Sequence, residues 1–477
     1  MKRTAQNFHH LAILAASLGA LSSSLPARAD EPPAADLATL LKRIKELEEK
    51  VNTLQQNHDT ERKEAIETAK TTPLVTLGGD GLVVKSADSN FVAFAHGYVQ
   101  ADGRFYPNQK ETTKDTFLLR RVRPILEGTV YQNFDYRLML DFASGNGSSS
   151  TAGNNALLDD AYVNARFWKE AQFQIGKYKS PIGLERLKST ADLTFVETGY
   201  ATALTPNYDL GAEVHNDYFK SPVGYALGIF NGATDGGSSD QDVNDEGKDI
   251  VGRLFFQPFL TGDNAVVKHF GLGVAGSFGN HQGALPSYKT SGQQTFYSYA
   301  TGLNAAGEQY RVDPQFFWHW GPLGVEGEFV ISSQKVQSTI AHTPAADRLQ
   351  NTAGQLEVSY FLTGEDSSFK SSSLVRVAPN HPFAVNGGGW GAFEIAGRLM
   401  QMSLDSKAFA DKYTTAGSAR AATAWDVGVN WYLNRNIKFN LDYESTAFRT
   451  GGGTTTGNGP VTSRDEHVIL TQVQVAF

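Results

Sequence analysis

The chain contains 477 residues, carries a formal net charge of −8 at neutral pH and has no cysteine. Without cysteine it can form no disulfide, no thiolate metal site and no cysteine nucleophile. The acidic balance argues against a nucleic-acid partner, because that interaction rests on a basic surface, although a local basic patch stays open.

The first 29 residues are predicted to be a secretory signal peptide. Two basic residues precede an apolar run at 11–21, and residues 27–29 (Ala-Arg-Ala) have the small-x-small form of a cleavage site. A membrane anchor would need about 18 or more apolar residues, and this run is shorter. We therefore expect an exported chain that begins at Asp30 and, having lost three basic residues, carries a formal charge of −11 instead of −8.

Residues 36–57 have the heptad pattern of a coiled coil, with apolar residues at alternating three- and four-residue steps. These residues are Leu37, Leu40, Ile44, Leu47, Val51 and Leu54. A single amphipathic helix lying on another surface is the alternative. A coiled coil requires a partner, so the pattern predicts an oligomer, and branched residues at position a with leucine at d favour a dimer. A polar linker is expected from 57 to 72, which completes an N-terminal segment of residues 30–72.

Residues 73–477 are predicted to form an all-β domain, and the hairpin at 117–142 illustrates its pattern. The return strand alternates between an apolar face, Tyr136, Leu138, Leu140 and Phe142, and an opposite face, Arg137, Met139 and Asp141. The outgoing strand alternates likewise, except that Ile125 falls on the face that carries Arg121 and Arg123. Such a hairpin fits either a soluble sheet packed on a core or a membrane barrel with lipid outside and a polar lumen.

The connections between strands favour the barrel. Two further hairpins, at 160–178 and 426–444, have turns of three or four residues. Other connections are long and Gly/Ser-rich or acidic: 144–155, 231–249, 281–294 and 451–464. Short turns at one rim and long loops at the other are typical of outer-membrane barrels, and the last strand ends on an outward Phe477. About ten residues per strand plus turns predicts a transmembrane antiparallel β-barrel of about 16 strands, with 14 or 18 left open.

Seven short segments of this domain form a sequence pattern that is recognised by their order along the chain. Three of them are GYVQADGRF, LRRVR and IGKYKSPIGLE. They are residues 97–105, 119–123, 158–163, 175–185, 244–253, 359–365 and 430–434. In this order and number they resemble the phosphate- and polyphosphate-selective porin O/P family over about residues 81–477. The resemblance implies a trimeric outer-membrane porin whose pore is narrowed by an inward-folded loop and lined with basic residues. A periplasmic N-terminal coiled coil would suit a trimer.

The resemblance also points to candidate pore-lining residues. Arg120 and Arg121 match the family's paired arginines, and Lys179 matches a lysine just before the loop that follows Pro181. Position in that loop, or strand alternation, adds further candidates: Arg186 and Lys188 by position, and Arg104, Arg123 and Arg137 by alternation. The guanidinium group suits this role because its fork of donors matches phosphate oxygens and it stays charged.

The predicted function is therefore passive diffusion of small anions through a homotrimer in the cell outer membrane, with phosphate or polyphosphate as the leading class by resemblance. No catalytic residue, metal site or cofactor is expected. Inward carboxylates oppose strict anion selectivity: Asp102, Asp141, Asp160, Asp426, Asp442 and Glu444. The first strand also has Phe94, His96 and Tyr98 where many relatives have basic residues. A general or weakly cation-selective porin without a phosphate site is the alternative.

Three other motifs are weaker. The GxGxxG match at 271–276 is followed by strand and turn residues and not by the helix that a dinucleotide site requires. The acidic run 240–249 resembles a calcium loop but has Asp245 where glycine is needed, so a surface loop is expected and calcium binding stays open. A barrel hydrolase would need Ser277 beside a histidine, in a segment that lacks the full GxSxG elbow.

Overall fold

The computed structural model describes residues 34–107, 114–143, 157–217, 219–239, 247–369, 376–450 and 465–477. It divides the chain into two compact units, residues 1–70 and 71–477, which are described separately. The predicted signal peptide and most of the acidic run, residues 240–246, lie outside the described residues. None of the helices in the described ranges is both long and apolar enough to cross a bilayer.

The first unit is the helix α1 (Ala34–Thr71). The helix runs past the last predicted heptad position, so the segment 57–72, which we expected to be a polar linker, is helical almost to Pro73. Proline fits the end of the helix because it lacks the amide that would continue it. The apolar heptad residues are all exposed, from 51% at Ile44 to 68% at Leu54. A stripe of this kind is unburied within one chain, and the coiled coil stays a prediction.

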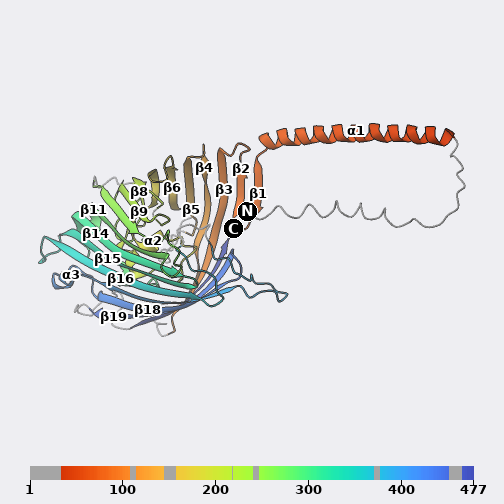
Figure 1. The fold of residues 1–477 in the computed structure, drawn as a ribbon. Coiled ribbons are helices and arrows are strands. Elements are labelled where there is room, and N and C mark those ends of the chain that lie inside the picture. The colour runs from red at the N-terminus through yellow and green to blue at the C-terminus, as the bar shows by residue number, and fades with distance from the viewer. Residues whose placement is uncertain are drawn as a thin grey trace. The chain divides into compact units, whose positions relative to one another are not determined.

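The second unit confirms the predicted all-β, antiparallel barrel (Figure 1). Its 18-stranded sheet consists of the hairpin β1 (Leu74–Gly78) and β2 (Gly81–Lys85) and of sixteen barrel strands in the described residues. The barrel strands are β3 (Phe91–Phe105), β4 (Thr116–Val130), β5 (Phe134–Asp141), β6 (Leu157–Ala165), β7 (Gln172–Lys179), β8 (Tyr208–His215), β9 (Val223–Phe230), β10 (Asp249–Phe256), β11 (His269–Ala284), β14 (Leu303–Trp320), β15 (Leu323–Ser338), β16 (Ala346–Phe361), β17 (Ala392–Ser403), β18 (Ala419–Tyr432), β19 (Ile437–Thr450) and β20 (Glu466–Ala476). The barrel closes where β20 pairs with β3 in antiparallel register.

The wall of the barrel is apolar outside and polar inside. On β18, Trp425, Val427 and Val429 are 44–50% exposed, whereas Asp426 and Asn430 on the other face are almost completely buried. A soluble sheet would bury the apolar set and expose the charged one, so this inverted pattern is that of a strand with lipid on one side and a polar lumen on the other.

The connections follow the predicted asymmetry with one difference. One rim has short turns such as 131–133 and 433–436, and the long loops lie at the other rim. The connection 362–391 between β16 and β17 is long although it lies at the short-turn rim, where Phe383 donates its amide to the carbonyl of Leu433. Strand alternation and loop composition do not predict this exception.

Two connections fold into the barrel. We call residues 180–207, between β7 and β8, the constriction loop; it contains the short helices α2 (Leu184–Leu187) and η1 (Tyr200–Leu204). The β11–β14 connection carries the small hairpin β12 (Tyr288–Lys289) and β13 (Thr295–Tyr297). Tyr200 and Leu204 share a buried cluster with Phe296 and Tyr297 of that hairpin. The main apolar core thus lies inside the barrel, between the two inserted segments, and α3 (Ser406–Ala410) follows β17.

Candidate functional site in the barrel lumen

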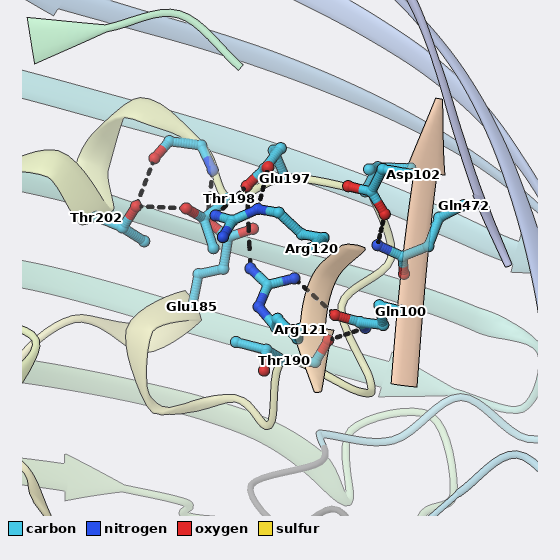
Figure 2. Close-up of polar contacts among 12 residues, drawn as sticks. Gln100, Asp102, Arg120, Arg121, Glu185, Thr190, Glu197, Thr198, Thr202 and Gln472 are labelled. Carbon is cyan, nitrogen blue, oxygen red and sulfur yellow. Dashed lines mark hydrogen bonds and ion pairs between the residues drawn. The ribbon is translucent and has the colours of Figure 1, made fainter. Parts of the chain in front are cut away.

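A β-bulge on β4 turns two consecutive arginines toward the lumen. In the register of β3 with β4, Gln100 pairs with Arg121 and Ala101 pairs with Leu119, so Arg120 is an extra residue on β4. Strict alternation would point Arg120 and Arg121 to opposite sides of the wall. A bulge leaves one residue unpaired and re-aims its side chain, and both guanidinium groups approach the constriction loop (Figure 2).

The carboxylate of Glu197, in the constriction loop, joins these arginines. It accepts hydrogen bonds from Nε of Arg120 at 2.6 Å and from Nη2 of Arg104 at 2.8 Å, and it lies 3.9 Å from Nη2 of Arg121. Burial would raise the pKa of Glu197, but the guanidinium groups, Arg120 above all, lower this pKa to about 2. Glu197 is therefore a fixed anion among three cations.

Arg123 and Arg137 have carboxylate partners of their own. Nε of Arg123 donates to Asp141 at 2.8 Å, and its Nη2 lies 2.7 Å from Asp159. Nε of Arg137 donates to Asp160 at 2.9 Å. Most of the arginine charge that strand alternation predicts is thus neutralised within the wall.

Lys179 and Arg186 differ from these arginines. Nζ of Lys179 donates to the carbonyl of Lys188 at 2.7 Å and lies 5.7 Å from the ring centroid of Tyr208. Arg186 donates to the carbonyl of Thr202 and, at 3.4 Å, to the hydroxyl of Thr205. Within the described ranges, neither cation forms an ion pair with a carboxylate.

These groups line a cavity of about 600 Å³. Its charged lining residues are Arg120, Arg121, Arg123, Lys179 and Arg186, together with Asp141, Asp159 and Glu185. Hydroxyl groups of Thr190, Thr198, Tyr208 and Ser238 also face it. The described lining therefore has more cations than carboxylates, and its hydroxyls can donate hydrogen bonds to an anion.

The carboxylates of the opposite wall hold the constriction loop. Glu328 on β15 accepts backbone hydrogen bonds from Leu184 at 2.6 Å and Glu185 at 3.2 Å. Asp313 on β14 accepts one from Gly183 at 2.9 Å. These bonds satisfy loop amides that would otherwise be buried without a partner, so the acidic wall anchors the loop.

Side-chain ion pairs complete this attachment. Nζ of Lys188 lies 2.8 Å from Glu326 and 3.5 Å from Glu357. Arg398 on β17 lies 3.2 Å from Glu185 of the loop and 2.6 Å from Asp426 of the wall. Carboxylates of the wall that the sequence analysis did not count, together with Asp426, which it did, are therefore used to fix the loop.

The predicted pore-lining residues thus divide into two groups. The cavity brings together Arg120, Arg121, Arg123, Lys179 and Arg186. Arg104, Arg137 and Lys188 are absent from the described lining of the cavity and are held in buried ion pairs. Glu197 and Tyr208 also belong to the site but were not predicted from the sequence. Tyr208 pairs with Lys179 across β7 and β8, so the hairpin register could have found it, whereas no periodic signal marks Glu197.

The residues of the weaker motifs belong to the barrel wall. Residues 271–276 lie within β11 and continue as strand. Ser277 accepts a hydrogen bond from Nη1 of Arg311 at 3.1 Å, and Nε2 of His281 lies 2.9 Å from Asp249. In the part of the chain that the structure describes, no cluster of three His, Asp or Glu residues is arranged to hold a metal.

Comparison with known proteins identifies a family and several similar proteins. The model of the family "Phosphate-selective porin O and P" matches residues 94–477. Porin O of Pseudomonas aeruginosa is 25% identical over 423 residues, which is 80% of this chain and 90% of that protein. Similar solved structures include an anion-selective porin from Comamonas acidovorans, with 11% identity, a TM-score of 0.49 and coverage of 81% of this chain and 100% of that chain. Another is the trimer form of OmpT from Vibrio cholerae, with 9% identity, a TM-score of 0.48 and coverage of 81% and 99%.

The family match extends from the first barrel strand to the last residue. The family consists of channels, and the wall pattern is that of a membrane barrel, so catalysis is not the role of this chain. The chain belongs to the phosphate-selective porin O and P family and is a non-enzymatic porin of the outer membrane.

Proposed function

We propose that this porin conducts small anions, with phosphate or polyphosphate as the leading class, and that the cavity binds them in transit. The observation that carries this proposal is the pair Lys179 and Arg186, two half-buried cations that line the cavity without an ion-pair partner in the described chain. A cation that is partly withdrawn from water favours an anion beside it, because its charge is less well solvated there. Family membership supports the same substrate class.

Binding in a channel must also be reversible. Tyr208 and Thr190 offer hydroxyls that can replace part of the hydration shell of an anion. Glu197, Asp141 and Asp159 already occupy donors of the neighbouring arginines, which limits how tightly an anion is held. A site of moderate affinity lets an ion enter and leave, as conduction requires.

The use of the acidic wall disfavours the cation-selective alternative. Carboxylates that accept loop amides, such as Glu328 and Asp313, face the constriction loop and not the cavity. Of the three carboxylates that line the cavity, Asp141 and Asp159 are paired with Arg123, and Glu185 is paired with Arg398. A permeating cation would have to compete with these guanidinium groups for them.

The test is a planar-bilayer measurement of reversal potential under a KCl gradient, followed by titration with phosphate. We expect anion selectivity and a chloride current that phosphate blocks. In the double variant Lys179→Gln/Arg186→Gln the block should weaken by at least about tenfold, because charge-assisted contacts are lost. Arg166→Gln is the matched control, since Arg166 pairs with Asp135 at the short-turn rim. Cation selectivity, or a phosphate block unaffected by the double variant, would contradict the proposal.

We also propose that the porin is a homotrimer to which α1 contributes a parallel coiled coil. The exposed apolar stripe of α1 supports this, because such a stripe is stabilised when equivalent helices pack against it. A truncation that removes residues 36–72 tests the coiled coil by the oligomer's resistance to dissociation in detergent. An equally resistant oligomer after truncation would show that α1 does not hold the subunits together.

A further inference from the structure

Two arginines lie side by side on the outer wall of the barrel, on the adjacent strands β18 and β19. In the register of β18 with β19, Ala419 pairs with Thr450 and Ala421 pairs with Arg449, so Arg420 is a bulged residue beside Arg449. Both side chains are exposed. Like charges opposite each other on a sheet are destabilising, so the pair calls for a counter-charge.

The described chain supplies no such counter-charge. Neither Arg420 nor Arg449 forms an ion pair or a side-chain hydrogen bond with any residue in the described ranges. Outward cations elsewhere on the wall, on β15 and β16, behave differently: Lys335 and Arg348 share Glu308, at 2.8 and 2.9 Å. The contrast indicates that the partner of the arginine pair is not part of the described fold.

The height of the pair on the wall indicates what that partner is. An aromatic row, Phe393, Trp431 and Phe439, stacks across β17–β19 near the short-turn rim. From Trp431 to Arg420 the strand rises about 37 Å at 3.4 Å per residue, and the usual barrel tilt reduces this to about 28 Å along the membrane normal. The apolar band of such barrels is about 25 Å tall, so the two guanidinium groups lie just beyond it, at the rim of the long loops.

The side chains between the aromatic row and the arginine pair become more polar toward the long-loop rim. Trp425 and Tyr443 lie 5.5 Å apart between ring centroids, and the Tyr443 hydroxyl is 2.9 Å from Nδ1 of His467. Between this aromatic group and the arginines, Thr423 pairs with Gln401. Amphipathic aromatics and then neutral polar residues mark the passage from the hydrocarbon region to the headgroups.

We propose that Arg420 and Arg449 bind the phosphate groups of a lipid headgroup in the outer leaflet. Long loops face the cell exterior in outer-membrane barrels, so this rim contacts that leaflet. Two adjacent guanidinium groups can donate several charge-assisted hydrogen bonds to phosphate oxygens. The site is on the outer wall and is independent of the ion selectivity of the pore.

The test uses the full-length oligomer in detergent, titrated with diphosphorylated lipid A and followed by native mass spectrometry. We expect the double variant Arg420→Gln/Arg449→Gln to raise the dissociation constant by at least about tenfold, because charge-assisted donors are lost. Arg435→Gln is the matched control, since Arg435 is an exposed arginine at the opposite rim, paired with Asp80. It should bind lipid A as the parent does.

The same titration separates the sources of phosphate. Lipid A without phosphates should bind no more tightly to the parent than to the double variant, and inorganic phosphate at millimolar concentration should not displace the lipid. Unchanged lipid A binding in the double variant would overturn the proposal. So would displacement by inorganic phosphate, or dissociation of the double variant into monomers, which would assign the arginines to a subunit contact. An unchanged single-channel conductance verifies that the variant is folded.

Discussion

The carboxylate of Glu197 lies 2.6 Å from Nε of Arg120, so a side chain of the constriction loop occupies donors that a permeating anion would otherwise use. The same carboxylate accepts a bond from Arg104 and lies 3.9 Å from Arg121. Glu197 thereby neutralises part of the positive charge of Arg104, Arg120 and Arg121. This arrangement adjusts how long an anion stays, and it leads to the first two predictions.

Glu197→Gln should increase the affinity of the channel for phosphate. The amide keeps the size of the side chain but removes the charge that competes for the three arginines. We expect the phosphate concentration for half-maximal block of the chloride current to fall by about fivefold to tenfold, a change of about 1–1.4 kcal/mol in binding free energy. Glu308→Gln, on the outer wall, is the control. A higher half-maximal concentration would mean that Glu197 assists binding.

The low pKa of Glu197 predicts how this difference depends on pH. Its pKa is about 2 in the folded protein and ordinarily 4.5, so its ion pairs are fully formed above about pH 4.5 and are lost as the pH falls through about 2. The ratio of chloride conductance between the parent and Glu197→Gln should therefore stay constant from pH 7 to about pH 4.5. It should approach one toward pH 2, where the protonated acid resembles the amide. A ratio that already changes between pH 7 and 5 would contradict the ion-pair assignment.

Strand alternation was sufficient to predict the barrel. Exceptions to the alternation mark places where a loop folds into the lumen and packs against the wall. Ile125 disturbs the polar inner face of β4 because it packs against Ala191 of the constriction loop, together with Tyr98 and Met139. An apolar residue on the lumen side thus indicates a segment folded inside. Ile125 could be recognised as an exception from the sequence, but the loop that packs against it could not.

The rest of the site depends on contacts that the two-residue periodicity of strands cannot predict. Arg120 faces inward because of a one-residue bulge, and the bulge is a property of the pairing with β3. Glu197 reaches the arginines from an irregular loop that is far from them in sequence. Glu328 and Asp313 were not among the inward acids named from the sequence, and the sequence could not show that backbone amides of the loop would donate to them.

Lys188→Met should loosen the constriction loop without removing a lining cation. Lys188 lies between Glu326 and Glu357, and its removal takes away the lysine partner of both carboxylates. Breaking a buried ion pair typically costs about 3–5 kcal/mol, so we expect a lower unfolding temperature and larger fluctuations of open-channel current. Lys335→Met, which removes an exposed lysine paired with Glu308, is the control and should change little. Identical current noise in both variants would show that Lys188 does not fix the loop.

Gly183→Ala should displace Arg186 and reduce anion selectivity. Gly183 lies near the start of the constriction loop and has a φ of 85°, a backbone conformation that disfavours a side chain. An added methyl would lie 2.7 Å from Cβ of Arg186 and 3.1 Å from the Thr205 hydroxyl oxygen. Gly364 has the same φ of 85° but would meet nothing within 4 Å, so Gly364→Ala isolates the backbone strain from the steric contact. We expect both variants to lose some thermal stability, by about 1–2 kcal/mol. Only Gly183→Ala should weaken phosphate block and shift the reversal potential toward zero. An equal loss of selectivity in both variants would mean that the close contact with Arg186 does not position this cation.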